Sequence, residues 1–168
     1  VRQMAEIRKN VHRWTDEGEL ADYLARIVSK NAGDGSGLVY GLGHAVYTLS
    51  DPRAVLLKEK ARALAEADGR LEEFALYDAL ERIGPEVIRK AHPGAREVCA
   101  NVDLYSGFVY DMLGIPQDLY TPLFAVGRVV GWCAHRMEEL HNAGPIIRPA
   151  YKPIFKARAY VPIEERGA

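Results

Sequence analysis

The sequence predicts an all-α protein, and two observations support this fold class. Apolar residues recur at spacings of three and four along most of the 168 residues, which is the period of amphipathic helices. Alternating runs of the kind that form half-buried strands are nearly absent. Hydrophobic residues make up 48% and charged residues 27% of the chain, as in ordinary globular proteins. We therefore expect one helical domain, or one domain and a piece of another.

The N-terminal half predicts three helices. The first is expected over residues 2–14 and the second over residues 20–28, ending near the glycine cluster at 31–37. Asp51 is the expected N-cap of the third helix, because Pro52 would then occupy the first helical position, where its missing N–H costs nothing. This helix should run to about residue 68, and Gly69 should end it.

The C-terminal half predicts three more helical segments and a tail. A helix over residues 71–90 is expected to be interrupted near Gly84-Pro85 and closed by residues 92–94. A short helix begins at about residue 104 and stops at Gly114, and a long one opens at residues 121–122 and runs to about residue 142. From residue 144 onward, repeated prolines predict an extended tail.

Composition excludes several classes of partner. The formal net charge of −1 gives no reason to expect nucleic acid or an anionic membrane. The longest apolar stretch, residues 123–134, is too short to span a bilayer and contains Arg128. Cys99 and Cys133 form no C-x-x-C pair, which predicts a reducing cytoplasm and buried thiols. No signal peptide is visible, and a start at Val1 inside a helical pattern suggests a fragment of a longer protein.

The segment "GLGHAVYTLSDPR", residues 41–53, contains the first candidates. Arg53 would lie in the first turn of a helix, where an exposed cation is disfavoured by about 0.3–1 kcal/mol. The same position offers backbone N–H groups that bind anions, so a carboxylate ligand held by the guanidinium would resolve the conflict. The alternative is a solvated arginine paired with Asp51 or Glu59.

His44 and Asp103 are candidates for proton chemistry. His44 lies among glycines that let a ligand approach the backbone, and histidine can donate a hydrogen bond to a reacting carbonyl. A structural histidine in a turn fits the same pattern. Asp103 precedes a predicted helix, so it is expected to be an N-cap, although a carboxylate there could also act as a general base.

Two further arginines lie in unusual surroundings. Arg128 shares a helix face with Phe124 and Trp132 in a nearly all-apolar segment, where an unpaired buried charge would be very costly. Its partner would be Asp103 or a bound carboxylate. Arg148 lies among prolines that fix the backbone, and simple surface placement explains it equally well.

Other kinds of site are rejected. His135 and His141 are six residues apart on one helix, which is not the one-turn spacing of a zinc pair, so no metal site is predicted. The cysteines have no strong claim as nucleophiles. No phosphate-binding loop and no dinucleotide-binding pattern is present.

Three ordered motifs resemble the C-terminal part of the citrate synthase family. They are the histidine motif "GLGHAVYTLSDPRA", the aspartate motif with its following helix "NVDLYSGFVYDMLGIPQDLYTPLFAVGRVVGWCAHRMEE", and the arginine segment "IIRPAYKP". The similarity extends from residue 1 to about residue 163.

The resemblance implies a mainly helical homodimer that condenses acetyl-CoA with oxaloacetate to give citrate and coenzyme A. Residues 1–103 would form the small, substrate-closing domain, and residues 104–168 would be helices and a tail that belong with a large domain outside this chain. No tightly bound cofactor is implied, since acetyl-CoA is a co-substrate.

The resemblance also implies roles for single residues. Asp103 would take a proton from the acetyl methyl group, and His44 would polarise the oxaloacetate carbonyl. Arg53 and Arg128 would bind oxaloacetate carboxylates, and Arg148 would do so in the partner's site. Backbone contacts to coenzyme A would come from Val39, Tyr40, Gly41, Leu42, Gly43 and Ala45.

The chain departs from the family pattern in two respects. The family's other catalytic histidine and the large N-terminal domain have no counterpart here, so the chain alone is expected to be inactive. Thr48 stands where related enzymes often carry a basic residue near coenzyme A. The alternatives are a 2-methylcitrate synthase using propionyl-CoA, a non-catalytic module that binds coenzyme A or a dicarboxylate, and an inert fragment.

Overall fold

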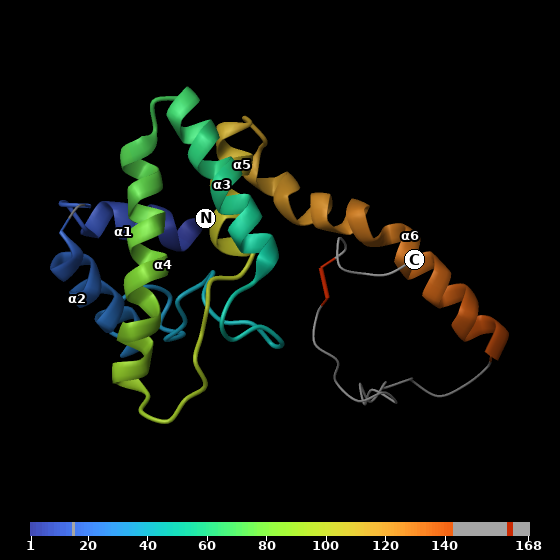
Figure 1. The fold of residues 1–168 in the computed structure, drawn as a ribbon, viewed down its shortest axis with the longest axis horizontal. Coiled ribbons are helices and arrows are strands. Elements are labelled where there is room, and N and C mark those ends of the chain that lie inside the picture. The colour runs from blue at the N-terminus through green and yellow to red at the C-terminus, as the bar shows by residue number, and fades with distance from the viewer. Residues whose placement is uncertain (15, 143–160, 163–168) are drawn as a thin grey trace. The chain divides into compact units, whose positions relative to one another are not determined.

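The computed structural model describes residues 1–14, 16–142 and 161–162. Within these residues the regular secondary structure is entirely helical, and an isolated bridge is the sole β-type pairing. The all-α prediction is thereby confirmed (Figure 1). The elements are α1 (Arg2–Asn10), α2 (Glu17–Val28), α3 (Pro52–Ala67), α4 (Leu71–Ala91), α5 (Asp103–Met112), the short 3-10 helix η1 (Gln117–Leu119) and α6 (Tyr120–Asn142).

The chain divides into two compact units, Val1–Ala125 and Val126–Ala168. The first unit contains α1 to α5 and the start of α6. The second contains the rest of α6, along which apolar side chains such as Val130 and Trp132 are exposed. The predicted domain boundary after residue 103 refers to a longer protein and stays a prediction. The predicted tail from residue 144 onward lies outside the described residues except for positions 161–162.

Helix α4 is at the centre of the first unit. It packs against α2, α3 and α5, and α3 also packs against α5; Figure 1 shows α4 running between α2 and α3. Each fully buried leucine or phenylalanine stabilises the fold by about 1.5–3 kcal/mol. The largest fully buried apolar side chains are Ile7, Val11, Leu20, Leu24, Ile27, Leu76, Leu80, Tyr105 and Phe108.

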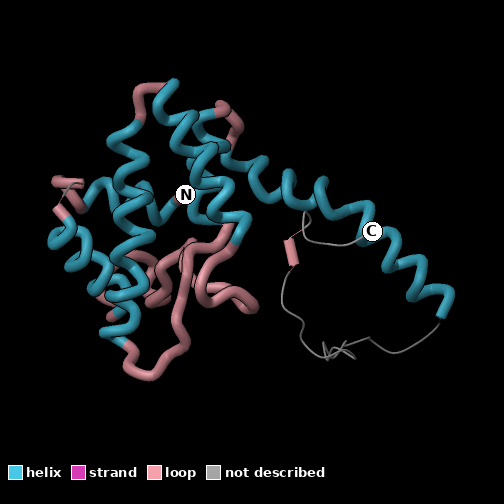
Figure 2. The backbone as a smooth tube through the Cα atoms, in the orientation of Figure 1, coloured by secondary structure: helices cyan, strands magenta, loops and turns pink. Residues whose placement is uncertain are grey.

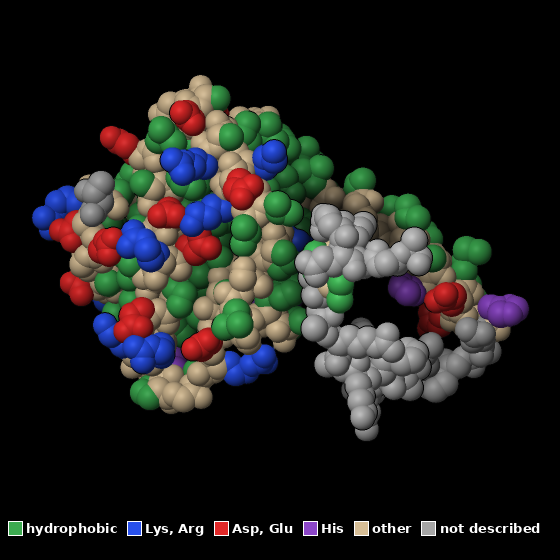
Figure 3. Space-filling model, viewed as in Figure 1, with side chains coloured by type: hydrophobic (Ala, Val, Ile, Leu, Met, Phe, Trp, Pro, Cys, Tyr) green, Lys and Arg blue, Asp and Glu red, His purple; other side chains and the backbone are tan. Residues whose placement is uncertain are grey.

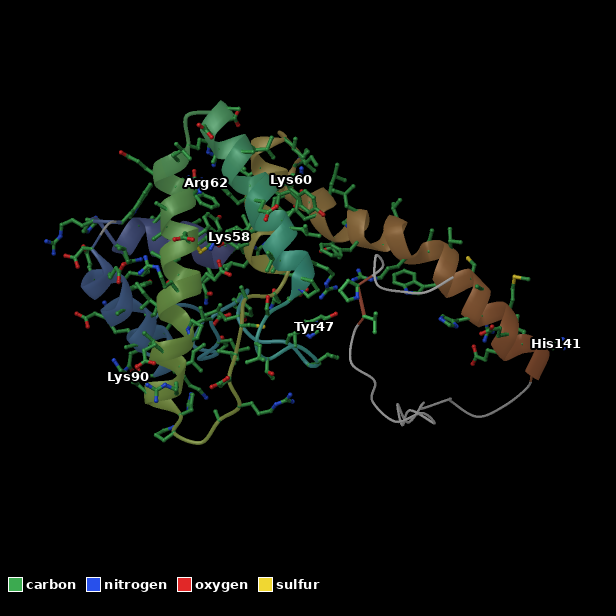
Figure 4. All side chains as sticks on the ribbon, in the orientation of Figure 1. Tyr47, Lys58, Lys60, Arg62, Lys90 and His141 are labelled. Atoms are coloured by element: carbon green, nitrogen blue, oxygen red, sulfur yellow. The ribbon has the colours of Figure 1, made fainter. Side chains whose placement is uncertain are left out.

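Polar contacts also join α3, α4 and α5. The Lys58 ammonium on α3 (labelled in Figure 4) lies 2.7 Å from a Glu81 carboxylate oxygen on α4. The buried Tyr105 hydroxyl on α5 donates to the same carboxylate. Burial, with Glu81 as a second cause, raises the pKa of Tyr105. Elsewhere on the visible face, acidic and basic side chains are interspersed (Figure 3).

Helix α1 is shorter than the predicted segment over residues 2–14, because it ends at Asn10. Beyond it, the backbone N–H groups of His12 and Arg13 donate to the Glu19 carboxylate at 2.9 and 3.1 Å. These donors would otherwise bond to helix carbonyls one turn earlier. A side chain in the first turn of α2 therefore ends α1, which the apolar period alone could not indicate.

Helix α4 is continuous, so the predicted interruption near Gly84-Pro85 is wrong. A proline in a helix interior costs about 3 kcal/mol in isolation. Here Leu80 and Val87 are buried on either side of it, and this burial outweighs the local cost. Gly84 leaves room for the loop before α3, since a Cβ there would lie 2.3 Å from Leu42 Cδ1.

The two long loops of the first unit, residues 29–51 and 92–102, run side by side (Figure 2). They are joined by an antiparallel bridge between Leu42 and Ala100. Gly41 has a φ of +95°, and a Cβ there would lie 2.9 Å from the Cα of Leu104 on α5. Glycine is therefore required at this position both for its backbone conformation and for the close approach to α5.

We predict that Gly41→Ala destabilises the chain more than Gly94→Ala. Gly94 has a φ of +90°, but a Cβ added there would meet no atom within 4 Å, so its substitution measures the backbone strain alone, about 1–3 kcal/mol. Gly41→Ala adds an overlap with the backbone of α5. Urea unfolding of both variants measures the difference, and equal losses of stability would show that the approach of Gly41 to α5 is not tight.

Candidate active site

The start of α3 is built around a buried carboxylate. The Asp51 side chain is 0% exposed and caps the helix, since Oδ1 accepts from the Arg53 backbone N–H at 3.0 Å. The same carboxylate accepts from Arg53 Nε at 3.0 Å and from Nη2 at 2.8 Å. Asp51 is therefore the N-cap, as predicted. Arg53 pairs with Asp51, as one of the alternatives in the sequence analysis expected. This pairing leaves the Arg53 side chain 52% exposed.

Each partner of this pair changes the pKa of the other. Hydrogen bonds from Arg53 hold the pKa of Asp51 below its ordinary value of 3.8, against the opposing effect of burial. The pKa of Arg53 is raised, mainly by its hydrogen bond to Asp51, with smaller contributions from Tyr47 and Asp103.

His44 is held in one orientation by the loop that follows it. Its Nδ1 accepts from the backbone N–H groups of Val46 at 2.9 Å and Tyr47 at 3.1 Å. The ring also lies 4.8 Å from the ring of Tyr47, which Figure 4 labels in the loop before α3. Because Nδ1 accepts these bonds, the tautomer assigned to the neutral ring carries its proton on Nε2.

The free edge of His44 faces Arg53. His44 Nε2 lies 3.1 Å from Arg53 Nη2, within hydrogen-bond distance, and the donor and acceptor roles in this contact depend on the tautomer of the ring. When Nε2 carries the proton, both groups are donors, and the oxygens of a bound carbonyl or carboxylate group would suit them as acceptors. The pair can therefore orient and polarise an oxo group.

Asp103 is the first residue of α5 and not its N-cap, so the predicted capping role is wrong. Val102 occupies the N-cap position without a side-chain hydrogen bond. The cap function is taken by Asn101, whose Oδ1 accepts from the Asp103 N–H at 2.9 Å. The Asp103 carboxylate is therefore not used by the helix, and its side chain is exposed.

Asp103 lines a pocket of about 470 Å³ in the first unit. The pocket brings it together with Val39, Tyr40, Gly41 and Leu42 of the segment predicted to contact coenzyme A. Gly43, His44, Ala45 and Arg53 are not among its lining residues. Further lining residues include Gln3, Val98, Asn101, Leu104 and Phe108.

Several predicted features lie elsewhere. Arg128 lies on α6 in the second unit and is exposed rather than buried, and Arg148 lies outside the described residues, so both roles stay predictions. Cys99 is buried as expected, but Cys133 is exposed, because its stretch of α6 is uncovered. Among the described residues no cluster of His, Cys, Asp or Glu could hold a metal, and no helix has the length and apolarity to cross a membrane.

Two amide side chains that sequence analysis did not single out hold the loop in place. Gln3, largely buried in α1, donates from Nε2 to Leu38 O and accepts from Tyr40 N, both at 2.8 Å. Asn101 donates from Nδ2 to Gly43 O at 2.8 Å. The position of Asn101 two residues before an aspartate at a helix start is a capping signal that could have found it. Nothing local marks Gln3.

Comparison with known proteins identifies the family. The family model for the citrate synthase C-terminal domain matches residues 1–150. The chain belongs to the citrate synthase family. The geometry agrees with the resemblance of the motifs, because a backbone bridge joins the loop of the histidine motif to the residue just before the aspartate motif.

Curated relatives support the assignment. The chain is 41% identical over 129 residues to the citrate synthase of Synechocystis sp., covering 76% of this chain and 31% of the relative. It is 42% identical over 131 residues to citrate synthase 2 of Bacillus subtilis, covering 77% and 32%. The chain therefore spans about one third of the length of these relatives.

Solved citrate synthases share the fold. The structure of the Thermoplasma acidophilum enzyme in ternary complex with carboxymethyl coenzyme A and oxaloacetate matches with a TM-score of 0.64 at 29% identity, over 97% of this chain and 40% of that one. The Thermotoga maritima enzyme matches with a TM-score of 0.61 at 29% identity, over 99% and 42%.

The pairing of Asp51 with Arg53 predicts a pH-dependent stability. Because the folded pKa of Asp51 is lowered, the ionised carboxylate stabilises the fold above pH 3.8 and loses this contribution as the pH falls through its folded pKa. Asp51→Asn should therefore destabilise the chain at neutral pH, with a difference from wild type that shrinks below pH 3.8. Urea unfolding at a series of pH values measures it. The exposed Asp22→Asn controls for the change in net charge, and a difference that does not vary with pH would contradict the assignment.

Proposed function

We propose that this chain supplies part of the active site of a citrate synthase that condenses acetyl-CoA with oxaloacetate to give citrate and coenzyme A. The observation that carries the proposal is the convergence of His44 Nε2 and Arg53 Nη2, 3.1 Å apart. Two donors at this separation fit the carbonyl oxygen and neighbouring carboxylate of a 2-oxo acid. Family membership over residues 1–150 supports the same reaction.

In the proposed mechanism, the Asp103 carboxylate takes a proton from the acetyl methyl group, and the resulting carbanion attacks the oxaloacetate carbonyl carbon. The carbonyl oxygen gains negative charge, which the N–H of His44 stabilises while Arg53 holds the neighbouring carboxylate, and this oxygen then takes up a proton to become the hydroxyl group of the product. Water then cleaves the thioester of the condensed product. Asp103 suits the role of base, because its carboxylate is exposed, lines the pocket and is not used as a helix cap.

The finer assignments belong to this proposal. Residues 39–43 and Ala45 contact coenzyme A, and Arg128 and Arg148 bind carboxylates, Arg148 across a homodimer. The location is the cytoplasm. A 2-methylcitrate synthase would use the same residues in the same roles, with propionyl-CoA as the acyl donor. The rates of thiol release from acetyl-CoA and propionyl-CoA decide between the two activities.

Asp103→Asn in the full-length protein should lower kcat by about 10²–10⁴-fold, the usual effect of losing a general base. The measurement is free thiol release from acetyl-CoA in the presence of oxaloacetate, with propionyl-CoA run in parallel. The matched control is Asp111→Asn, the same change on the same helix, where the carboxylate pairs with Arg70 at 2.6 Å. Near-normal turnover by Asp103→Asn would refute its role as the base.

The 168-residue chain alone should release no thiol under the same conditions, because it spans about one third of the length of its relatives. If the chain binds oxaloacetate or coenzyme A without turnover, it acts as a binding module that holds only some of the residues of the active site. Oxaloacetate-dependent thiol release by the isolated chain would show that its own residues suffice, and this part of the proposal would be wrong.

A further inference from the structure

Asn101 forms hydrogen bonds both to the loop that carries His44 and to Asp103 at the start of α5. Its backbone N–H donates to Gly41 O at 2.9 Å as part of the bridge. Its side chain donates from Nδ2 to Gly43 O at 2.8 Å and accepts at Oδ1 from Asp103 N at 2.9 Å. The amide thus connects the residue before His44 with Asp103 itself.

The orientation of this amide is fixed by its partners. Oδ1 faces an N–H and Nδ2 faces a carbonyl oxygen. The flipped amide would place a donor against a donor and an acceptor against an acceptor. Aspartate in the same place would present oxygen to Gly43 O, and alanine would remove both bonds. The position therefore requires the donor and acceptor of an asparagine side chain.

Other contacts also hold the loops 29–51 and 92–102 in place. Gly43 N donates to Cys99 O at 2.8 Å, Gly41 packs against Leu104, and Leu42 fits beside Gly84. None of these contacts involves the Asn101 side chain. Losing that side chain should therefore leave the bridge and the fold in place, and alter the fine spacing between the two loops.

We propose that Asn101 is a positioning residue, whose side-chain amide sets the distance between His44 and Asp103. The inference rests on the proposed function, in which these two residues act on the two substrates of one condensation. The donor to the electrophile and the base for the nucleophile must be placed so that the reacting carbons meet. A displacement of about 1 Å in such an arrangement can cost about 10²-fold in rate.

The kinetic test uses Asn101→Ala in the full-length protein, with thiol release as the assay. We expect kcat to fall by about 10- to 100-fold, with KM for oxaloacetate changed by less than about threefold, because Asn101 has no hydrogen bond to Arg53. Asn101→Asp, which keeps the acceptor toward Asp103 N but not the donor toward Gly43 O, should also lower kcat.

Gln3→Ala is the matched comparison. Gln3 is also an amide that bonds to this loop, but at Leu38 and Tyr40, earlier in the sequence than Gly43. Its loss should raise KM for acetyl-CoA more than it lowers kcat. A merely structural role for Asn101 predicts that the two variants lose stability and activity in parallel, and that pattern would overturn the proposal.

A second readout does not depend on activity. In the 168-residue chain, ¹⁵N NMR of the His44 ring and of the Asp103 amide reports the position of both ends. Asn101→Ala should shift both sets of resonances, whereas Gln3→Ala should leave the Asp103 amide in place. Unmoved His44 resonances would overturn the positioning role.

The outcomes separate the two proposals. An active wild-type protein with kcat of Asn101→Ala within about twofold of normal would refute the role of Asn101 and leave the proposed function intact. A wild-type full-length protein without thiol release would refute the proposed function. In that case the NMR shifts alone decide whether Asn101 sets the position of His44.

Discussion

The rest of the structure depends on the antiparallel contact between residues 41–43 and residues 99–101. The two segments are far apart in sequence, so closing the loop between them has an entropic cost that the contacts must offset. The contacts that do so come from three helices: α1 through Gln3, α4 through the space at Gly84, and α5 through its approach to Gly41. Contacts from α1, α4 and α5, together with the bridge itself, therefore hold the two loops side by side.

The buried Asp51 carboxylate explains how a cation can lie at the start of α3. A helix N-terminus favours negative charge, and Asp51 supplies it while also receiving the guanidinium of Arg53. The repulsion between Arg53 and the helix dipole is therefore offset within three residues of sequence. The half-exposed guanidinium lies beside His44, so the pairing that caps α3 also fixes the position of Arg53 next to this histidine.

Features of the fold that depend on residues close together in the sequence could be predicted. The capping of α3 by Asp51 and the class of the fold follow from residue types and period, and the structure agrees. The continuous α4 could not be predicted, since burial on either side of Pro85 overrides its local effect. The end of α1 depends on Glu19, a residue of the next helix.

The candidate site also has features that the local sequence predicts and features that it does not. His44, Arg53 and Asp103 are recognisable by motif, but the local pattern around Asp103 predicts a cap. That prediction fails because Asn101, two residues earlier, caps the helix instead. The distant partners of Asn101 and Gln3 are set by tertiary structure and leave no periodic or local signal in the sequence.

The converging donors have a consequence for selectivity under the proposed function. If Nε2 carries the proton, His44 and Arg53 are both donors at this contact, so each would need an acceptor oxygen supplied by the substrate. A dicarboxylate without an oxo group would leave the His44 donor desolvated and unpaired, and such a loss costs far more than a missing apolar contact. Discrimination for a 2-oxo acid would then arise mainly from the fixed tautomer of His44, which the backbone N–H groups of Val46 and Tyr47 impose. The loop that holds the histidine would therefore also select the substrate.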